Sequence, residues 1–308
     1  MVYNQLLPVA ALPGGAETTL VFPPYVLDSA EGRWTTRCST YYVEDMNRTN
    51  DTLSGSFTIS APPPWPDTWG EGEPMPAPSN KGIKDGGWLV VPPGLTDAPQ
   101  YIFAAKGNKT SEFYRYTVAT GTWTQAASIP LGREGKLPSK GCKAVANQLG
   151  YVYMTKGNNT PGFWRYDPSK DSWRQLADVP LGRSNKKVKD GNDLACFMKA
   201  GEQYVYLVKG QKTNEFWRYR VSGDSWSPLQ AVPVDLPAIK TNAGSWLELV
   251  EEATDAHPYL YLHKSTYHHL HRYDLINEAW VPGRRTGMPF VGKSGRPKKS
   301  KDGGSATF

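Results

Sequence analysis

The stretch Tyr151 to Pro180, YVYMTKGNNTPGFWRYDPSKDSWRQLADVP, occurs in related form at three further places in the chain. Clear copies run from Tyr101 to Pro130 and from Tyr204 to Pro233, and a weaker copy runs from Tyr259 to Pro282. Each copy places a Tyr seven residues before a Trp. Self-similarity at a period of about 50 residues, with several short strands in each unit, is typical of the blades of a β-propeller.

One repeat divides into four strands by its alternation of apolar and polar residues. Residues 141–147, GCKAVAN, are short and small, as an innermost strand near the axis requires. Residues 150–156 predict a second strand, residues 162–167 a third, and a fourth begins at Trp173 and ends near Ala177. We expect the Tyr and Trp of the two outer strands to fill the space between adjacent blades. An Arg directly precedes the repeat Tyr in all four copies, and we interpret its role as structural.

The two ends of the chain predict a closed ring. Residues 25–34, YVLDSAEGRW, match an outer-strand pair, and residues 300–308, SKDGGSATF, match an inner strand. We therefore expect one all-β propeller domain over 1–308, in which residues 300–308 join residues 1–35, since closure removes exposed strand edges. The other repeats lie near 80–130, 140–180, 190–233 and 242–282, with an irregular one near 36–70. Six recurring Trp residues favour six blades, and five blades with an irregular insert is the alternative.

Composition excludes several classes of protein. The chain has 308 residues, is 12% aromatic, and contains no run of 18 apolar residues, so we expect no membrane span. No signal peptide is recognisable at the N-terminus. Cys38, Cys142 and Cys196 fit no metal spacing; a bridge between the last two is conceivable, but buried free thiols are favoured.

The repeats resemble those of kelch-type β-propellers. The resemblance lies in the glycine pairs at 86–87 and 303–304 and in the recurring Tyr and Trp, and it covers about residues 80–308. The pair is Gly-Cys at 141–142 and Gly-Asn at 191–192, so the repeat is a variant. It resembles the repeats of secreted or surface-attached bacterial kelch-like proteins. The resemblance implies the fold and an extracytoplasmic location, and it implies no activity.

Strand directions predict which loops share a face. The loop between the second and third strands of a blade should lie beside the loops that link blades, and both classes are rich in Lys. We predict a lysine crown around the channel mouth, which would concentrate anions. The candidate ligand-binding residues are Lys84, Lys106, Lys140, Lys156, Lys186, Lys187, Lys189, Lys209, Lys301, Asp190 and Asp193. The competing interpretation is a self-neutralised rim, in which Asp85, Asp190, Asp193 and Asp302 pair with these lysines.

Other chemical signals are weaker. The KGNKT, KGNNT and KGQKT loops carry groups that could bind sugar hydroxyls, but ordinary turn chemistry explains them better. His269 and His271 could share a metal, yet His271 takes the place of an aromatic residue in the other repeats. No catalytic motif, cofactor motif or nucleic-acid module is recognised, so we predict no cofactor, no metal and no nucleic-acid partner.

Three functions follow as hypotheses. The first is a non-catalytic binding or scaffolding propeller that engages an anionic polysaccharide or a protein through its lysine-rich face. The second is a carbohydrate-active enzyme that uses carboxylates such as Asp190 and Asp193 at the channel mouth. The third is a structural component of a larger surface assembly. The sequence does not fix the oligomeric state.

Overall fold

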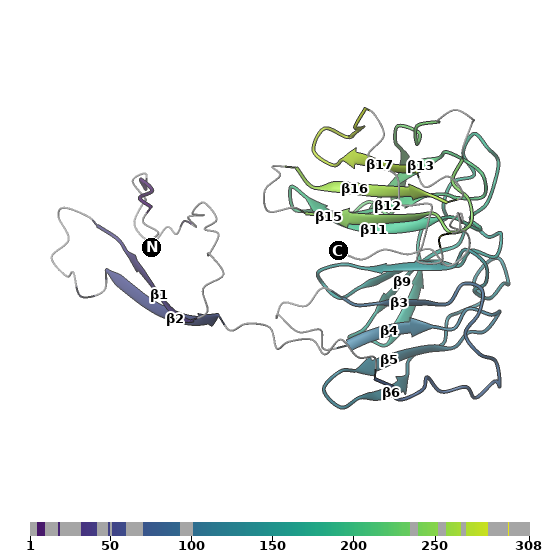
Figure 1. The fold of residues 1–308 in the computed structure, drawn as a ribbon, viewed down its shortest axis with the longest axis horizontal. Coiled ribbons are helices and arrows are strands. Elements are labelled where there is room, and N and C mark those ends of the chain that lie inside the picture. Colours follow the sequence, from purple (N-terminus) through teal and green to yellow (C-terminus); the bar gives the residue numbers. More distant parts are fainter. Residues whose placement is uncertain are drawn as a thin grey trace. The chain divides into compact units, whose positions relative to one another are not determined.

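The computed structural model describes residues 5–9, 18, 32–41, 49, 51–59, 70–92, 101–234, 240–251, 257–265, 269–282 and 295 (Figure 1). The regular structure of these residues is β-sheet, and the chain forms two compact units, Met1–Glu71 and Gly72–Phe308. No helix of the described residues has the length and apolar character needed to cross a membrane.

The N-terminal unit contains an antiparallel pair of strands. Strand β1, Gly32–Ser39, pairs with β2, Thr52–Ile59, so that Trp34 of β1 lies opposite Phe57. Residues 300–308, and most of residues 1–31, lie outside the described residues. Closure of a ring by residues 1–35 and 300–308, and a single domain over 1–308, therefore stay predictions.

The second unit contains four antiparallel sheets of four strands each, every sheet formed by consecutive strands. The first sheet holds β3 (Trp88–Val90), β4 (Tyr101–Ala105), β5 (Phe113–Thr117) and β6 (Thr122–Gln125). The second holds β7 (Lys143–Ala146), β8 (Val152–Thr155), β9 (Phe163–Asp167) and β10 (Ser172–Gln175). The third holds β11 (Asp193–Lys199), β12 (Glu202–Val208), β13 (Phe216–Arg220) and β14 (Ser225–Pro228). The fourth holds β15 (Trp246–Val250), β16 (Tyr259–Lys264), β17 (His269–Asp274) and β18 (Ala279–Trp280).

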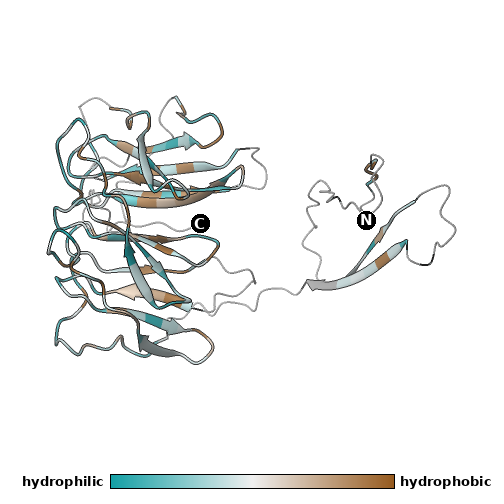
Figure 2. Cartoon of the chain, turned by 180° about the vertical axis from the view of Figure 1, so that it is seen from behind, coloured by the Kyte–Doolittle hydropathy of each residue, from teal (hydrophilic) through white to brown (hydrophobic). Residues whose placement is uncertain are grey.

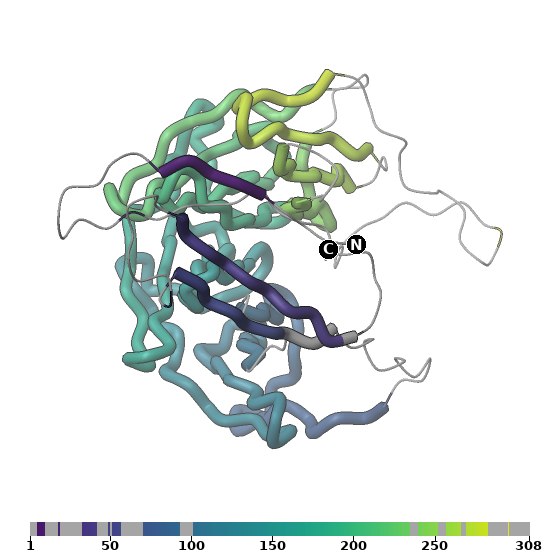
Figure 3. Tube along the Cα trace, turned by 90° about the vertical axis from the view of Figure 1, so that its left-hand side faces the viewer, coloured from purple at the N-terminus to yellow at the C-terminus, as the bar shows by residue number. Residues whose placement is uncertain are grey.

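The first strands of successive sheets contact one another, β3 with β7, β7 with β11 and β11 with β15. Figure 3 shows the four sheets following one another around an arc, which is the arrangement of blades in a β-propeller. The all-β fold with four-stranded antiparallel blades is thus confirmed, and the strands expected in the repeat at 141–177 are all present. The number of blades and the kelch assignment stay predictions.

Aromatic side chains fill the space between blades, as the sequence predicts. Phe163 of the second sheet lies with its ring centroid 4.9 Å from those of Tyr219 and Trp226 in the third. Phe216 of the third sheet meets Tyr273 and Trp280 of the fourth at 4.9 and 5.2 Å. In Figure 2 the hydrophobic colour follows the strands, while the loops that join them are mostly hydrophilic.

Glycines bring the blades together near their first strands. Gly157 has a φ of +59°, and a Cβ on it would lie 2.3 Å from the backbone carbon of Gly141. A Cβ on Gly141 would in turn lie 2.1 Å from the carbonyl oxygen of Lys189 in the next blade. Only glycine fits such an approach of backbone to backbone. The first contact lies within the second blade, and the second joins the second blade to the third through the main chain.

The described cysteines are free thiols, as the favoured sequence interpretation expects, but of the three only Cys142 is buried. Cys142 is buried, and its Sγ accepts a hydrogen bond of 3.2 Å from the indole N–H of Trp88 in the preceding blade. Cys196 is half-buried and Cys38 is exposed.

Candidate functional site

The loops that link blades lie beside the loops between second and third strands, which confirms the topology expected from strand direction. The backbone N–H of Asn158 donates to the carbonyl of Lys140, and the N–H of Gln211 donates to the carbonyl of Asp190. In the first blade the N–H of Asn108 donates to the carbonyl of Asp85 in the same way, and the N–H of Lys84 donates to the carbonyl of Lys106. We call the surface formed by residues 79–86, 107–111, 130–141, 157–161, 180–191 and 210–214 the loop face.

Three lysines of the predicted crown, however, are buried. Lys106, Lys156 and Lys209 are at most 1% exposed. The ammonium of Lys156 donates to the carbonyls of Pro130, Leu131 and Lys136, all in the linker that precedes its blade. The prediction that these three lysines face a ligand at the channel mouth is therefore wrong: their stems are long enough to tie each second strand to the linker beside it.

Two of the buried lysines also have a carboxylate partner. Lys106 lies 2.5 Å from Glu112, and Lys209 lies 2.8 Å from Glu215. Gly162 occupies the corresponding place in the second blade, so Lys156 has carbonyl partners and the ring of Trp164, 4.5 Å away. Burial lowers the pKa of Lys156 to about 8.

The remaining lysines of the predicted set differ in exposure. Lys84, Lys140 and Lys186 are exposed on the loop face, and Lys189 is half-buried. Lys187 forms a 3.0 Å salt bridge with Glu134 of the neighbouring linker, so one lysine is neutralised as the competing interpretation expects, but by a glutamate. Lys301 lies outside the described residues.

The two aspartates of the predicted set have different places. Asp190 is half-buried on the loop face. Asp193 begins β11, where its carboxylate lies 3.7 Å from the ammonium of Lys143 on β7 and accepts the backbone N–H of Leu247 on β15 at 3.1 Å. Asp193 thus links the first strands of three blades. Burial raises its pKa despite these contacts.

The KGN-x-T loops are turns, as their residues favour. Asn158 has a φ of +48°, and its side-chain amide donates to the carbonyl of Leu137 at 2.9 Å. The hydroxyl of Thr160 donates to the carbonyl of Gly157 at 2.9 Å. These polar groups are consequently engaged with the protein itself.

The place of His271 matches its interpretation as a substitute for an aromatic residue. His271 is buried, pairs across the sheet with Leu262, and places its ring centroid 6.3 Å from that of Trp280. Among the described residues, no group of three or more His, Cys, Asp or Glu side chains is arranged to hold a metal.

A carboxylate two residues before the repeat Trp is a contact that the sequence analysis missed. Asp224 accepts the hydroxyl of Tyr219 and the backbone N–H of Ala177 in the preceding blade, both at 2.7 Å. Asp171 makes the corresponding contacts with Tyr166 and Ala127. The signal was present as the D-S-W before the repeat Trp in the second and third blades; the first blade has G-T-W and the fourth E-A-W at this place.

Comparison with known proteins gives structural similarity and no family. No protein-family model matches the chain, and no curated protein matches it. A solved structure of YjhT is 14% identical with a TM-score of 0.42, over 66% of this chain and 65% of that one. Two structures from Bacteroides thetaiotaomicron also match: an auxiliary nutrient binding protein (13%, TM-score 0.41, 66% and 49% coverage) and a protein of unknown function (14%, 0.45, 73% and 54%). The matched region thus spans about half to two thirds of these proteins.

Proposed function

We propose that the protein is a non-catalytic binding module that engages an anionic polymer, such as an acidic polysaccharide or an acidic protein surface, through its loop face. The observation that carries the proposal is the exposure of Lys84, Lys140 and Lys186 on that face. None of the three forms a salt bridge with a described carboxylate. An extracytoplasmic location is part of the same proposal.

Backbone contacts between the segments of the loop face support the proposal that its lysines act as one binding site. A Cβ on Gly86 would lie 2.1 Å from the carbonyl oxygen of Ser139, and one on Gly141 would lie 2.1 Å from that of Lys189. The segments that carry Lys84, Lys140 and Lys189 therefore contact one another in series. Positive charges placed along such a series can act together on a polymer that carries regularly spaced anions.

The test is binding of polygalacturonate and of heparin, measured at two or more salt concentrations. Binding that releases counterions weakens linearly with the logarithm of salt, with a slope that reflects the number of cations engaged. Replacing Lys84, Lys140 and Lys186 together with Ser should weaken binding and reduce the magnitude of that slope by roughly two to three.

Lys170 provides a control for the loss of a single lysine charge, to be compared with Lys186. It is an exposed lysine in the turn between β9 and β10, at the opposite end of the blade from the loop face. Lys170→Ser should leave binding unchanged, while Lys186→Ser should weaken it. Equal affinities of the wild-type protein and the triple variant, in folded samples, would refute the proposal.

A further inference from the structure

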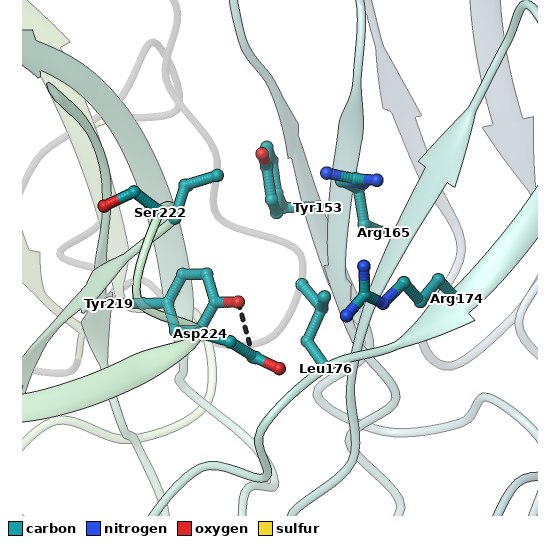
Figure 4. Close-up of a pocket in the computed structure, with 8 residues that line it drawn as sticks. Tyr153, Arg165, Arg174, Leu176, Tyr219, Ser222 and Asp224 are labelled. Carbon is teal, nitrogen blue, oxygen red and sulfur yellow. Dashed lines mark hydrogen bonds between the residues drawn. The ribbon is translucent and has the colours of Figure 1, made fainter. Parts of the chain in front are cut away.

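A cavity of about 120 Å³ lies between the second and third blades. Figure 4 shows Arg165 and Arg174 on one wall, with Tyr219, Ser222 and Asp224 opposite. Arg165 pairs across the sheet with both Tyr153 on β8 and Arg174 on β10, so one row of three side chains crosses the blade. Strand register therefore places the side chains of Arg165 and Arg174 next to each other on one face of the sheet.

The polar groups of this cavity have few partners in the protein. The Nε of Arg165 and the hydroxyl of Tyr153 are buried and form no hydrogen bond with the described residues. Arg165 stacks on the ring of Tyr151 at 4.6 Å, and neither Arg165 nor Arg174 forms a salt bridge with a described carboxylate. Asp224, the acidic residue of the lining, accepts hydrogen bonds from Tyr219 and Ala177. Burial opposes its charge, but these bonds and the nearby charge of Arg174 lower its pKa.

At the junction between the third and fourth blades, the chain itself supplies a carboxylate to the arginine at the corresponding position. Arg218 is the counterpart of Arg165, and its guanidinium lies 2.5 Å from the carboxylate of Glu278 in the fourth blade. Lys199 lies 2.9 Å from the same carboxylate. The counterpart of Glu278 in the third blade is Asp224, whose side chain is one methylene shorter. At this position, therefore, the fold binds a carboxylate between two cations.

We propose that the cavity between the second and third blades binds the carboxylate of a small organic acid or of an acidic sugar, with Arg165 and Arg174 as its cations. Arg174 replaces Ser227 of the third blade and supplies the second cation, as Lys199 does at the next junction. Guanidinium groups bind carboxylates through paired hydrogen bonds. Tyr153, which is protonated at neutral pH, supplies a hydroxyl donor.

The volume of the cavity limits the size of the chemical group that it can hold. Pockets for whole drug-sized ligands occupy roughly 300–1,000 Å³. A cavity of about 120 Å³ accommodates one acidic group and leaves the remainder of a larger ligand outside. This site is formed by strands and by the turn after β13, and it does not depend on the loop-face proposal.

The experiment measures binding of sodium acetate, sodium glucuronate and glucose by calorimetry at constant ionic strength. Binding of acetate together with glucuronate indicates recognition of the carboxylate itself, and binding of glucuronate alone indicates an acidic sugar. Arg174→Ser should weaken this binding by about tenfold or more, because hydrogen bonds to charged groups are lost. Arg174 is exposed, so the variant is expected to fold.

Two further variants keep the test specific. Arg174→Glu places a carboxylate beside Arg165 and should abolish binding, while Arg183→Ser removes an exposed guanidinium from the loop face and should leave it unchanged. The triple lysine variant of the loop face should also bind normally. The proposal is overturned if glucose binds as well as glucuronate, if neither acid binds, or if Arg183→Ser weakens binding as much as Arg174→Ser.

Discussion

The indole N–H of Trp226 donates a hydrogen bond of 2.9 Å to the carbonyl of Ala177 in the preceding blade. Trp173 and Trp280 make the same contact with Ala127 and Gln230. The repeat Trp is therefore both an apolar filler and a polar link between blades. Phe163 packs against Trp226 from the other side of the junction.

Trp226→Phe should destabilise the protein by about 1–3 kcal/mol, because it leaves the Ala177 carbonyl without this donor and shrinks a packed ring. Urea denaturation measures the change. Trp123→Phe is the comparison, since the hydrogen bond of Trp123 to the carbonyl of Glu73 lies at an exposed position. Equal losses in both variants would contradict a structural role specific to the blade junction.

Gly162→Glu should stabilise the protein at neutral pH by roughly 1–3 kcal/mol, because it gives Lys156 the carboxylate that Lys106 and Lys209 already have. A Cβ on Gly162 would lie 3.2 Å from the indole nitrogen of Trp164, so a small shift of that ring is needed. Gly162→Gln is the control, with similar size and no charge.

The same variant predicts a change in pH dependence. The pKa of Lys156 is lowered by burial from 10.5 to about 8, so between these values the unfolded state binds more protons. The contribution of Lys156 to stability therefore rises with pH over that window. In Gly162→Glu this rise should shrink, because the carboxylate raises the pKa of Lys156. Denaturation at pH 7 and pH 10 measures it, and an unchanged difference would argue against the assignment.

Glu278→Gln should reduce the loss of stability in acid. Burial of Glu278 opposes its charge, but hydrogen bonds from Lys199 and Arg218 outweigh it, so its pKa is lowered. A lowered carboxyl pKa gives stability that is present above the unfolded value of 4.5 and is lost as pH falls through the folded value. Thermal unfolding from pH 7 to pH 3 should be less steep in Glu278→Gln, and a curve parallel to wild type would refute the pairing.

Cys38 should react with a thiol reagent at once in the folded protein, while Cys142 should react only on unfolding. Cys38 is exposed, whereas Cys142 is 1% exposed and burial raises its pKa to about 12, so it carries almost no thiolate at neutral pH. Mass spectrometry of the labelled peptides locates the modified residues. Rapid labelling of Cys142 would show that the contact with Trp88 is open in solution.

The sequence by itself determined the repeat, the four strands of each blade and the face on which the loops meet. Those features depend on the period of apolar residues, on turn residues and on strand direction, all of which are local. Tyr219 and Trp226 could be assigned to the space between blades for the same reason, whereas the contact of Phe163 with both rings appears only in the structure.

The roles of the lysines were decided by tertiary structure. Lys156 and Lys186 both belong to Lys-rich loops, but the first reaches carbonyls of the preceding linker and the second lies exposed. A lysine side chain is long enough either to reach buried carbonyls or to extend into solvent. Which of the two it does depends on acceptors that are distant in sequence. The pairing of Arg165 with Arg174 likewise depends on strand register, and the cavity beside them on the neighbouring blade, so neither is visible in the sequence around one residue.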